Sequence, residues 1–163
     1  AVFAARDRCD ETVERIRSVR TDRFKYIRNF HPGRPHLQPN RYKDAKAIVK
    51  RLRQLHAEKA LDDLQERLLF SEIRPKEELY DLAADPHETH NLADDSAYRS
   101  NLEALRGRLD RWIEETGDRG QTPEPEAMYD SDMAVYLESK DTQADSVLRK
   151  NIAQMKAWAA EGK

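Results

Sequence analysis

The segment from Ala97 to Thr116 constrains the fold of this chain more than any other. Its apolar residues recur every three or four positions, and they are Tyr98, Leu102, Leu105, Leu109, Trp112 and Ile113. This spacing predicts one amphipathic helix with a single apolar stripe. Ser96 is a suitable N-cap and Gly117 a natural C-terminal stop. Because the stripe must be buried, we expect this helix to cover the apolar face of a sheet.

Three short segments can supply that sheet. Residues 14–21 and 24–30 are rich in β-branched and aromatic side chains and are separated by two residues, which is typical of an antiparallel hairpin. Residues 78–82 form a further strand candidate. So small a sheet has little core of its own. The predicted fold class is therefore α+β, with a small antiparallel sheet packed by the helix of residues 97–116.

Additional helices are expected outside this core. Apolar residues recur at helical spacing in residues 42–56, 61–70 and from about 143 to 161. Pro123 and Pro125 lie in an acidic linker before the last of these helices. The sequence therefore divides into residues 1–126 and a helical extension, residues 127–163.

Composition excludes several classes of protein. Of the 163 residues, 38% are hydrophobic and 37% charged, and no run approaches the roughly 18 apolar residues of a membrane-spanning helix. Cys9 is the only cysteine, which excludes a disulfide scaffold. A mean hydropathy of -0.97 is low for a self-sufficient domain. Since the sequence also opens at Ala1 without a methionine, we expect it to be part of a larger protein.

Charge is distributed unevenly along the chain. Residues 1–53 carry 15 Lys and Arg against 6 Asp and Glu, whereas the remainder is acidic. An anionic partner could bind the basic part, or the two parts could neutralise each other in the fold. The basic segment 14–30 also has interleaved aromatic residues, so a non-enzymatic interaction or nucleic-acid-binding module is one possible function. It contains no recognisable nucleic-acid-binding motif.

The densest group of polar side chains lies near the N-terminus. Six polar or ionisable residues follow an apolar entry, and they are Arg6, Asp7, Arg8, Cys9, Asp10 and Glu11. Such a group could hydrogen-bond a polar substrate, or it could be a solvated loop of self-neutralising pairs. His87 and His90 are spaced as zinc ligands can be, but they follow an Asp-Pro turn and lack a third ligand, so no metal site is predicted.

Several segments, in order, resemble the C-terminal part of sulfatases. The resemblance rests first on the ELYDL segment at residues 78–82, the DPHE segment at 85–88 and the NLA segment at 91–93. The hairpin of residues 16–30 and the RDRCDE segment at residues 6–11 match the same family. The latter resembles bacterial sulfatases similar to N-sulfoglucosamine sulfohydrolase. The resemblance covers about residues 2–126.

The resemblance implies an enzyme of the alkaline phosphatase-like superfamily that hydrolyses sulfate esters or sulfamates of sulfated sugars. Such enzymes have a large α/β N-terminal catalytic domain and a C-terminal subdomain, a four-stranded antiparallel sheet packed by a helix. Their formylglycine is made from Cys or Ser in a C/S-x-P-x-R motif, and they use calcium. A bacterial sulfatase of this kind is expected in the periplasm or outside the cell.

The family's catalytic residues cannot be placed on this chain. Cys9 is followed by Asp10, Glu11, Thr12 and Val13, so it lacks the proline and the arginine of the formylglycine motif. Calcium and formylglycine are therefore expected in an N-terminal catalytic domain, which would be this chain's partner. The chain alone is expected to be inactive, with no catalytic residue and no metal ligand.

The resemblance also places the RDRCDE segment near the rim of the substrate pocket, of which the subdomain forms one wall. The candidate substrate-binding residues are Arg6, Asp7, Arg8, Asp10 and Glu11. The arginines would bind a sulfate or carboxylate on a sulfated carbohydrate, and the carboxylates would accept hydrogen bonds from hydroxyl groups or an amine. The DPHE turn is expected to be structural, and Leu92 to be buried beside the long helix.

Overall fold

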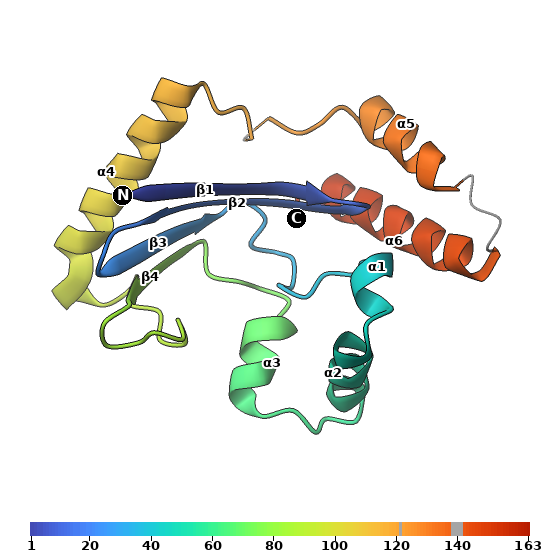
Figure 1. The fold of residues 1–163 in the computed structure, drawn as a ribbon, viewed down its shortest axis with the longest axis horizontal. Helices are drawn as coiled ribbons and strands as arrows, with labels where there is room; N and C mark the ends of the chain where they lie inside the picture. Colours follow the sequence, from blue (N-terminus) through green and yellow to red (C-terminus); the bar gives the residue numbers. More distant parts are fainter. Residues whose placement is uncertain (121, 138–141) are drawn as a thin grey trace. The chain divides into compact units, whose positions relative to one another are not determined.

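The fold is α+β, and the computed structural model describes residues 1–120, 122–137 and 142–163 (Figure 1). Four strands form one antiparallel sheet in the order β1-β2-β3-β4. In chain order the elements are β1 (Val2–Cys9), β2 (Thr12–Arg20), β3 (Phe24–Asn29), α1 (Arg41–Asp44), α2 (Ala47–Ala57), α3 (Asp63–Leu69), β4 (Glu77–Asp81), the 3-10 helix η1 (Ser96–Tyr98), α4 (Arg99–Thr116), α5 (Glu126–Leu137) and α6 (Thr142–Ala160). The predicted fold class is confirmed.

The register of the central strands gathers three side chains into the core. Val19 of β2 lies opposite Tyr26 of β3, and Tyr26 lies opposite Leu79 of β4. All three are fully buried. The hairpin and the strand of the ELYDL segment are therefore confirmed, and each contributes an alternate residue to one apolar face.

The first strand was not expected from its residues, although the sulfatase resemblance implied four strands. β1 ends in Arg6, Asp7, Arg8 and Cys9, which lack the apolar alternation of a half-buried strand. It forms one edge of the sheet, where charged side chains are common because they discourage pairing with another chain.

The chain forms two compact units, each assembled from three segments. Unit 1 comprises residues 1–7, 14–32 and 75–122, and unit 2 comprises residues 8–13, 33–74 and 123–163. The division expected at residues 126 and 127 separates a sulfatase-like part from an extension, and it stays a prediction.

The long helix α4 supplies most of the core of unit 1. Its predicted stripe is confirmed, because the four leucine and isoleucine side chains are buried, namely Leu102, Leu105, Leu109 and Ile113. They form one cluster with Val19, Tyr26, Leu79 and Leu92. The burial of Leu92 beside this helix is thereby confirmed. At one end of the cluster, Phe3 stacks on Trp112 with ring centroids 5.3 Å apart.

Unit 2 has a smaller core between two helices. Tyr129 and Met133 of α5 pack with Met155 of α6. The helix expected over residues 42–56 is two helices, α1 and α2, because Asn40 caps the first and Lys46 adopts an extended conformation before the second. The helix α5 was not expected, since its apolar residues do not follow one face.

We expect Leu109→Ala to lower the free energy of unfolding by about 2–5 kcal/mol, because this side chain is fully buried in the unit 1 core. Urea unfolding followed by circular dichroism measures the change. Arg108→Ala is the matched control in the same helix, since Arg108 is exposed, and it should change stability by less than about 0.5 kcal/mol. Equal effects of the two substitutions would contradict this account of the core.

Candidate functional site

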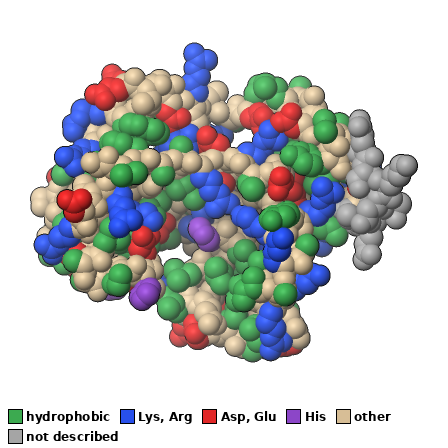
Figure 2. Space-filling view, in the orientation of Figure 1, with side chains coloured by type: hydrophobic (Ala, Val, Ile, Leu, Met, Phe, Trp, Pro, Cys, Tyr) green, Lys and Arg blue, Asp and Glu red, His purple; other side chains and the backbone are tan. Residues whose placement is uncertain are grey.

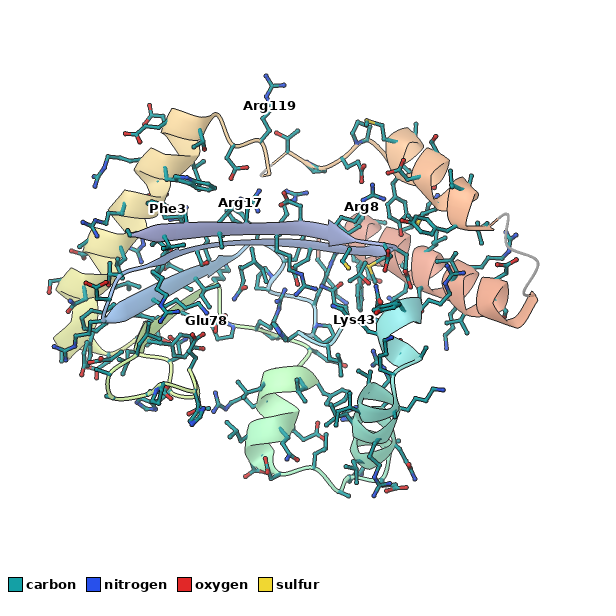
Figure 3. All side chains as sticks on the ribbon, in the orientation of Figure 1. Phe3, Arg8, Arg17, Lys43, Glu78 and Arg119 are labelled. Carbon is teal, nitrogen blue, oxygen red and sulfur yellow. The ribbon has the colours of Figure 1, made fainter. Side chains whose placement is uncertain are left out.

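Asp7, one of the candidate binding residues, belongs to an ion-pair cluster in unit 1. Its carboxylate accepts hydrogen bonds from Nη1 and Nη2 of Arg17 at 2.7 and 3.1 Å. Asp118 accepts from Nε and Nη2 of the same guanidinium at 2.5 and 3.0 Å. The Arg17 side chain is only 2% exposed (labelled in Figure 3). Asp7 is thus already engaged in neutralising a buried charge.

Two glycines after α4 bring Asp118 to this cluster. Gly117 ends the helix with a left-handed φ of 61°, as the sequence predicted. A Cβ added at Gly120 would lie 1.5 Å from Nη2 of Arg17. Glycine is therefore required at position 120 because the buried guanidinium occupies that space. The hydrogen bond to Asp118 and the nearby Asp7 raise the pKa of Arg17, and the same contact lowers the pKa of Asp118.

Glu11 is buried within unit 2 and is only 1% exposed. Its Oε1 accepts hydrogen bonds from the backbone N–H of Arg41 at 2.5 Å and from Nδ2 of Asn151 at 2.8 Å. Its carbonyl oxygen accepts from the Tyr129 hydroxyl at 2.8 Å. Burial and the charge of Glu11 raise the pKa of Tyr129. Glu11 thus fastens the turn after β1 to three helices, which is a structural arrangement.

Arg8 and Asp10 are the candidate residues that the structure brings to one surface feature. They line a hollow of about 400 Å³ together with three residues of α5, namely Asp132, Val135 and Tyr136. Arg8 donates a hydrogen bond to Asp132 and forms an ion pair with Glu124 at 3.3 Å. Burial opposes its charge, but these two carboxylates outweigh burial and raise the pKa of Arg8. Figure 3 labels Arg8 at the end of β1.

The α5 residues of this hollow were missed at the sequence level. No regular apolar face marks this helix, and Asp132 lies far from Arg8 in sequence. A usable signal was the apolar run from Met133 to Leu137, which interrupts an otherwise acidic segment.

Arg6 differs from Arg8, since the Arg6 side chain makes no ion pair with any residue that the structure describes. The carbonyl oxygen of Arg6 accepts a hydrogen bond from Arg17 at 3.5 Å.

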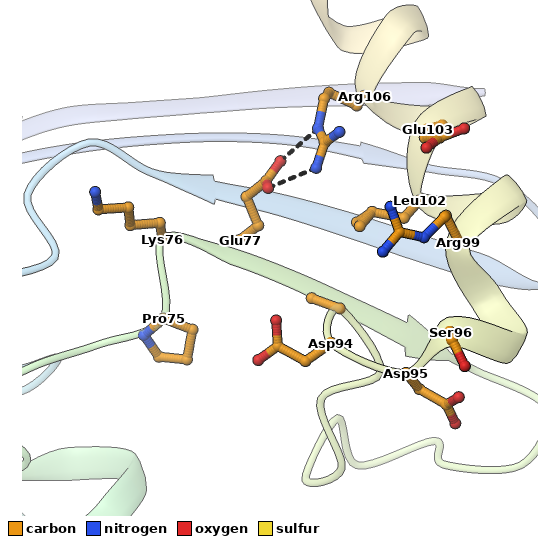
Figure 4. Close-up of a pocket in the computed structure, with 11 residues that line it drawn as sticks. Pro75, Lys76, Glu77, Asp94, Asp95, Ser96, Arg99, Leu102, Glu103 and Arg106 are labelled. Carbon is orange, nitrogen blue, oxygen red and sulfur yellow. Dashed lines mark hydrogen bonds and ion pairs between the residues drawn. The ribbon is translucent and has the colours of Figure 1, made fainter.

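A second hollow, of about 340 Å³, lies in unit 1 between β4 and α4 (Figure 4). Arg106 donates two hydrogen bonds to Glu77, at 2.8 and 2.7 Å. This contact lowers the pKa of Glu77 despite its partial burial. Four carboxylates and three cations line the hollow, and they are Glu77, Asp94, Asp95, Glu103, Lys76, Arg99 and Arg106. So mixed a lining gives no net attraction for an anion.

The basic hairpin of residues 14–30 is largely neutralised within unit 1. Its paired cations and their carboxylates are Arg17 with Asp7 and Asp118, Arg23 with Asp81, Lys25 with Glu88, and Arg28 with Asp110. On the face shown in Figure 2, positive and negative side chains are interspersed. Part of the uneven charge of the sequence is thus compensated in the fold.

The DPHE segment forms the predicted turn. The carboxylate of Asp85 accepts hydrogen bonds from the backbone N–H groups of Thr89 and His90 at 2.7 and 2.8 Å. These bonds lower the pKa of Asp85. Glu88 has a left-handed φ of 55°, which a tight turn requires. The predicted turn is confirmed, and its purely structural role stays a prediction.

Within residues 1–120, 122–137 and 142–163, no group of three or more His, Cys, Asp or Glu side chains could hold a metal ion. None of the helices in these ranges is both long and apolar enough to cross a membrane. Cys9 is an exposed free thiol.

A four-stranded antiparallel sheet packed by one long helix, with the ELYDL strand, the DPHE turn and the buried NLA leucine, agrees with the C-terminal subdomain expected for a sulfatase. The homologues of this chain are indeed sulfatases. An ulvan-active sulfatase of Formosa agariphila is 40% identical over 125 residues, which is 77% of this chain and 21% of that enzyme. Another ulvan-active sulfatase of the same bacterium is 32% identical over 111 residues.

The human N-sulphoglucosamine sulphohydrolase is 51% identical over a shorter stretch of 45 residues, which is 28% of this chain and 9% of that enzyme. No family model matches the chain. The chain spans about a fifth of the length of the ulvan-active sulfatase that it matches over 125 residues. It therefore corresponds to one part of a sulfatase.

We expect Asp118→Asn to destabilise the protein by about 1–3 kcal/mol at pH 7, because the buried Arg17 loses one of its two charged partners. The pKa of Asp118 is lowered in the folded state, so its stabilisation is complete above the ordinary pKa of about 3.9 and is lost as the pH falls through the lower folded-state pKa. Chemical unfolding at a series of pH values should show the difference between the two proteins shrinking below about pH 4.

Glu115→Gln is the control for this prediction. Glu115 is an exposed residue of α4, so its substitution should change stability by less than about 0.5 kcal/mol. A difference between Asp118→Asn and the unsubstituted protein that stays constant down to about pH 2 would contradict the assigned ion pair.

Proposed function

We propose that this chain is the C-terminal part of a sulfatase that hydrolyses sulfate esters or sulfamates of sulfated sugars, and that it forms one wall of the substrate pocket. The observation that carries the proposal is the 40% identity to an ulvan-active sulfatase over 77% of the chain. The ELYDL, DPHE and NLA segments occur in the order expected for sulfatases, and the first of them forms strand β4 of the sheet. Both observations support the proposal. The partner of the chain is then the N-terminal catalytic domain of the same enzyme.

The residues of this chain do not fit the groups that sulfatases use for bond cleavage. Cys9 lacks the proline and arginine of the formylglycine motif, and no described cluster of side chains could hold calcium. We assign both groups to the N-terminal catalytic domain. This chain then binds and orients the carbohydrate, and it supplies no group for the cleavage step.

Among the five candidate residues, burial and pairing suggest different roles. Glu11 is inaccessible and Asp7 is engaged by Arg17, so both position the strand and its turn. Arg8 is neutralised by two carboxylates. Arg6 retains an uncompensated charge, and a guanidinium is well suited to bind a sulfate or carboxylate with two hydrogen bonds. Arg6 is therefore our candidate for binding an anionic group of the substrate.

In the longer sulfatase that contains this segment, Arg6→Gln should raise the KM for a sulfated oligosaccharide about tenfold or more, because a charged hydrogen bond to the substrate is lost. Steady-state kinetics of sulfate release measure this change. The matched control is Arg20→Gln, since Arg20 is exposed at the end of β2, and its KM should not change. An unaltered KM in Arg6→Gln with normal thermal unfolding would overturn the role of Arg6.

The chain by itself is expected to give no turnover of a chromogenic aryl sulfate such as 4-nitrophenyl sulfate. The reason is that its only cysteine lacks the sequence context for conversion to formylglycine. Spectrophotometric detection of nitrophenol release checks this expectation. Turnover that persists in purified chain and disappears on Cys9→Ala would show that the catalytic group lies here after all.

A further inference from the structure

The hollow beside α5 carries an excess of negative charge. Among the described residues that line it, Arg8 is the single cation and already pairs with Asp132 and Glu124, and Asp10 adds a third carboxylate. Asp10 makes no hydrogen bond or ion pair with any residue that the structure describes. A sulfate or carboxylate group placed here would meet repulsion that one shared guanidinium does not offset. The electrostatics of the hollow thus disfavour a ligand that carries a sulfate or carboxylate group.

The polar side chains of the hollow offer both donors and acceptors. The carboxylates of Asp10 and Asp132 accept hydrogen bonds, while a guanidinium such as that of Arg8 presents several N–H donors. Asp132 is half-exposed, so its oxygens remain accessible beside the pair with Arg8. Hydroxyl groups both donate and accept. A compact molecule with several hydroxyl groups therefore matches these three side chains.

The remainder of the lining is apolar. Val135 and Tyr136 are 68% and 41% exposed and lie next to each other on α5. Single exposed apolar residues are ordinary on protein surfaces. These two, however, line a hollow together with three ionisable groups, and an apolar surface with a few convergent polar groups is typical of small-molecule sites. A sugar ring has the matching character, because its C–H face can cover a tyrosine ring while its hydroxyl groups bond at the edge.

The backbone at Asp10 has a left-handed conformation. Asp10 has a φ of 52° in the two-residue loop between β1 and β2. Glycine adopts this left-handed conformation without strain, and a two-residue hairpin loop favours glycine at such a position. Aspartate tolerates it at some cost.

We propose that this hollow binds a sugar residue of the substrate that carries no sulfate, held by Asp10, Asp132 and Arg8 and covered by Tyr136. The carbohydrate class of the ligand rests on the proposed sulfatase function. The negative charge of the hollow determines the specificity, because it disfavours a sugar ring that carries sulfate. Residues of α5, outside the segments that resemble sulfatases, then contribute to substrate choice.

Binding to the purified 163-residue chain tests this inference without any turnover. The neutral probes are the methyl glycosides of glucose, galactose and mannose, and the negatively charged probe is N-sulphoglucosamine. Titrations followed by amide chemical shifts should show at least one neutral glycoside binding with a dissociation constant in the millimolar range, as for a small ligand at an open site. N-sulphoglucosamine should bind at least about tenfold more weakly because of its charge.

Two substitutions locate the binding. Tyr136→Ala and Asp10→Gly should each weaken the neutral glycoside at least about fivefold, whereas Tyr42→Ala, which removes another exposed tyrosine, should not. Asp10→Gly has a second readout, because glycine relaxes the left-handed turn. Its midpoint of thermal unfolding should stay constant or rise while binding is lost, which a merely structural role of Asp10 would not produce.

Several results would overturn the inference. They are tighter binding of N-sulphoglucosamine than of every neutral glycoside, absence of binding by all three neutral probes, or unchanged affinity in Asp10→Gly. The outcome is separable from that of the proposed function. Failure of sulfate release in the longer enzyme leaves the glycoside result intact, and failure of glycoside binding leaves the Arg6 prediction intact.

Discussion

Much of unit 1 depends on the ion pairs of one buried guanidinium, that of Arg17. Arg17 is 2% exposed and has Asp7 on one strand and Asp118 after α4 as its charged partners. A buried cation is tolerated only when it is paired and hydrogen-bonded, so strand β1, strand β2 and the end of α4 must come together for any of them to be stable. Gly120 is part of the same constraint because a side chain there would occupy the space of the guanidinium. The separation of basic and acidic residues along the sequence therefore becomes local neutralisation in the fold.

The turn after β1 divides its two carboxylates between structure and surface. Glu11 is enclosed and bonds to the Arg41 backbone and to Asn151, while its carbonyl binds Tyr129. Asp10, its neighbour, faces a hollow in a left-handed backbone conformation. Glu11 fixes the turn, and the turn places Asp10 at the hollow. This arrangement explains how adjacent acidic residues, indistinguishable by charge, can have different roles, since only the accessible one can reach a ligand.

The predictable part of the fold was the part with regular apolar spacing. The α4 stripe buries four of the apolar residues that its 3.6-residue period marks, and the hairpin and the ELYDL strand form the predicted antiparallel pairs. The strand β1 and the helix α5 follow neither. In β1 charged side chains hide the alternation typical of a strand, because β1 lies at the edge of the sheet. Helix α5 has apolar residues on more than one side. For the five candidate binding residues, the sequence could not separate the buried Glu11 from the more accessible side chains, and their role in substrate binding stays a prediction.

The sequence by itself determined the α+β class, the helix that covers the sheet, the DPHE turn and the relation to sulfatases, because local periodicity, turn chemistry and ordered motifs are properties of neighbouring residues. Only the tertiary structure decided which charges are compensated. Arg8 meets Asp132 and Arg17 meets Asp118 across more than a hundred residues of chain. Whether a charged side chain binds a ligand or holds the fold together depends on such distant partners and on burial, and neither is encoded in local spacing.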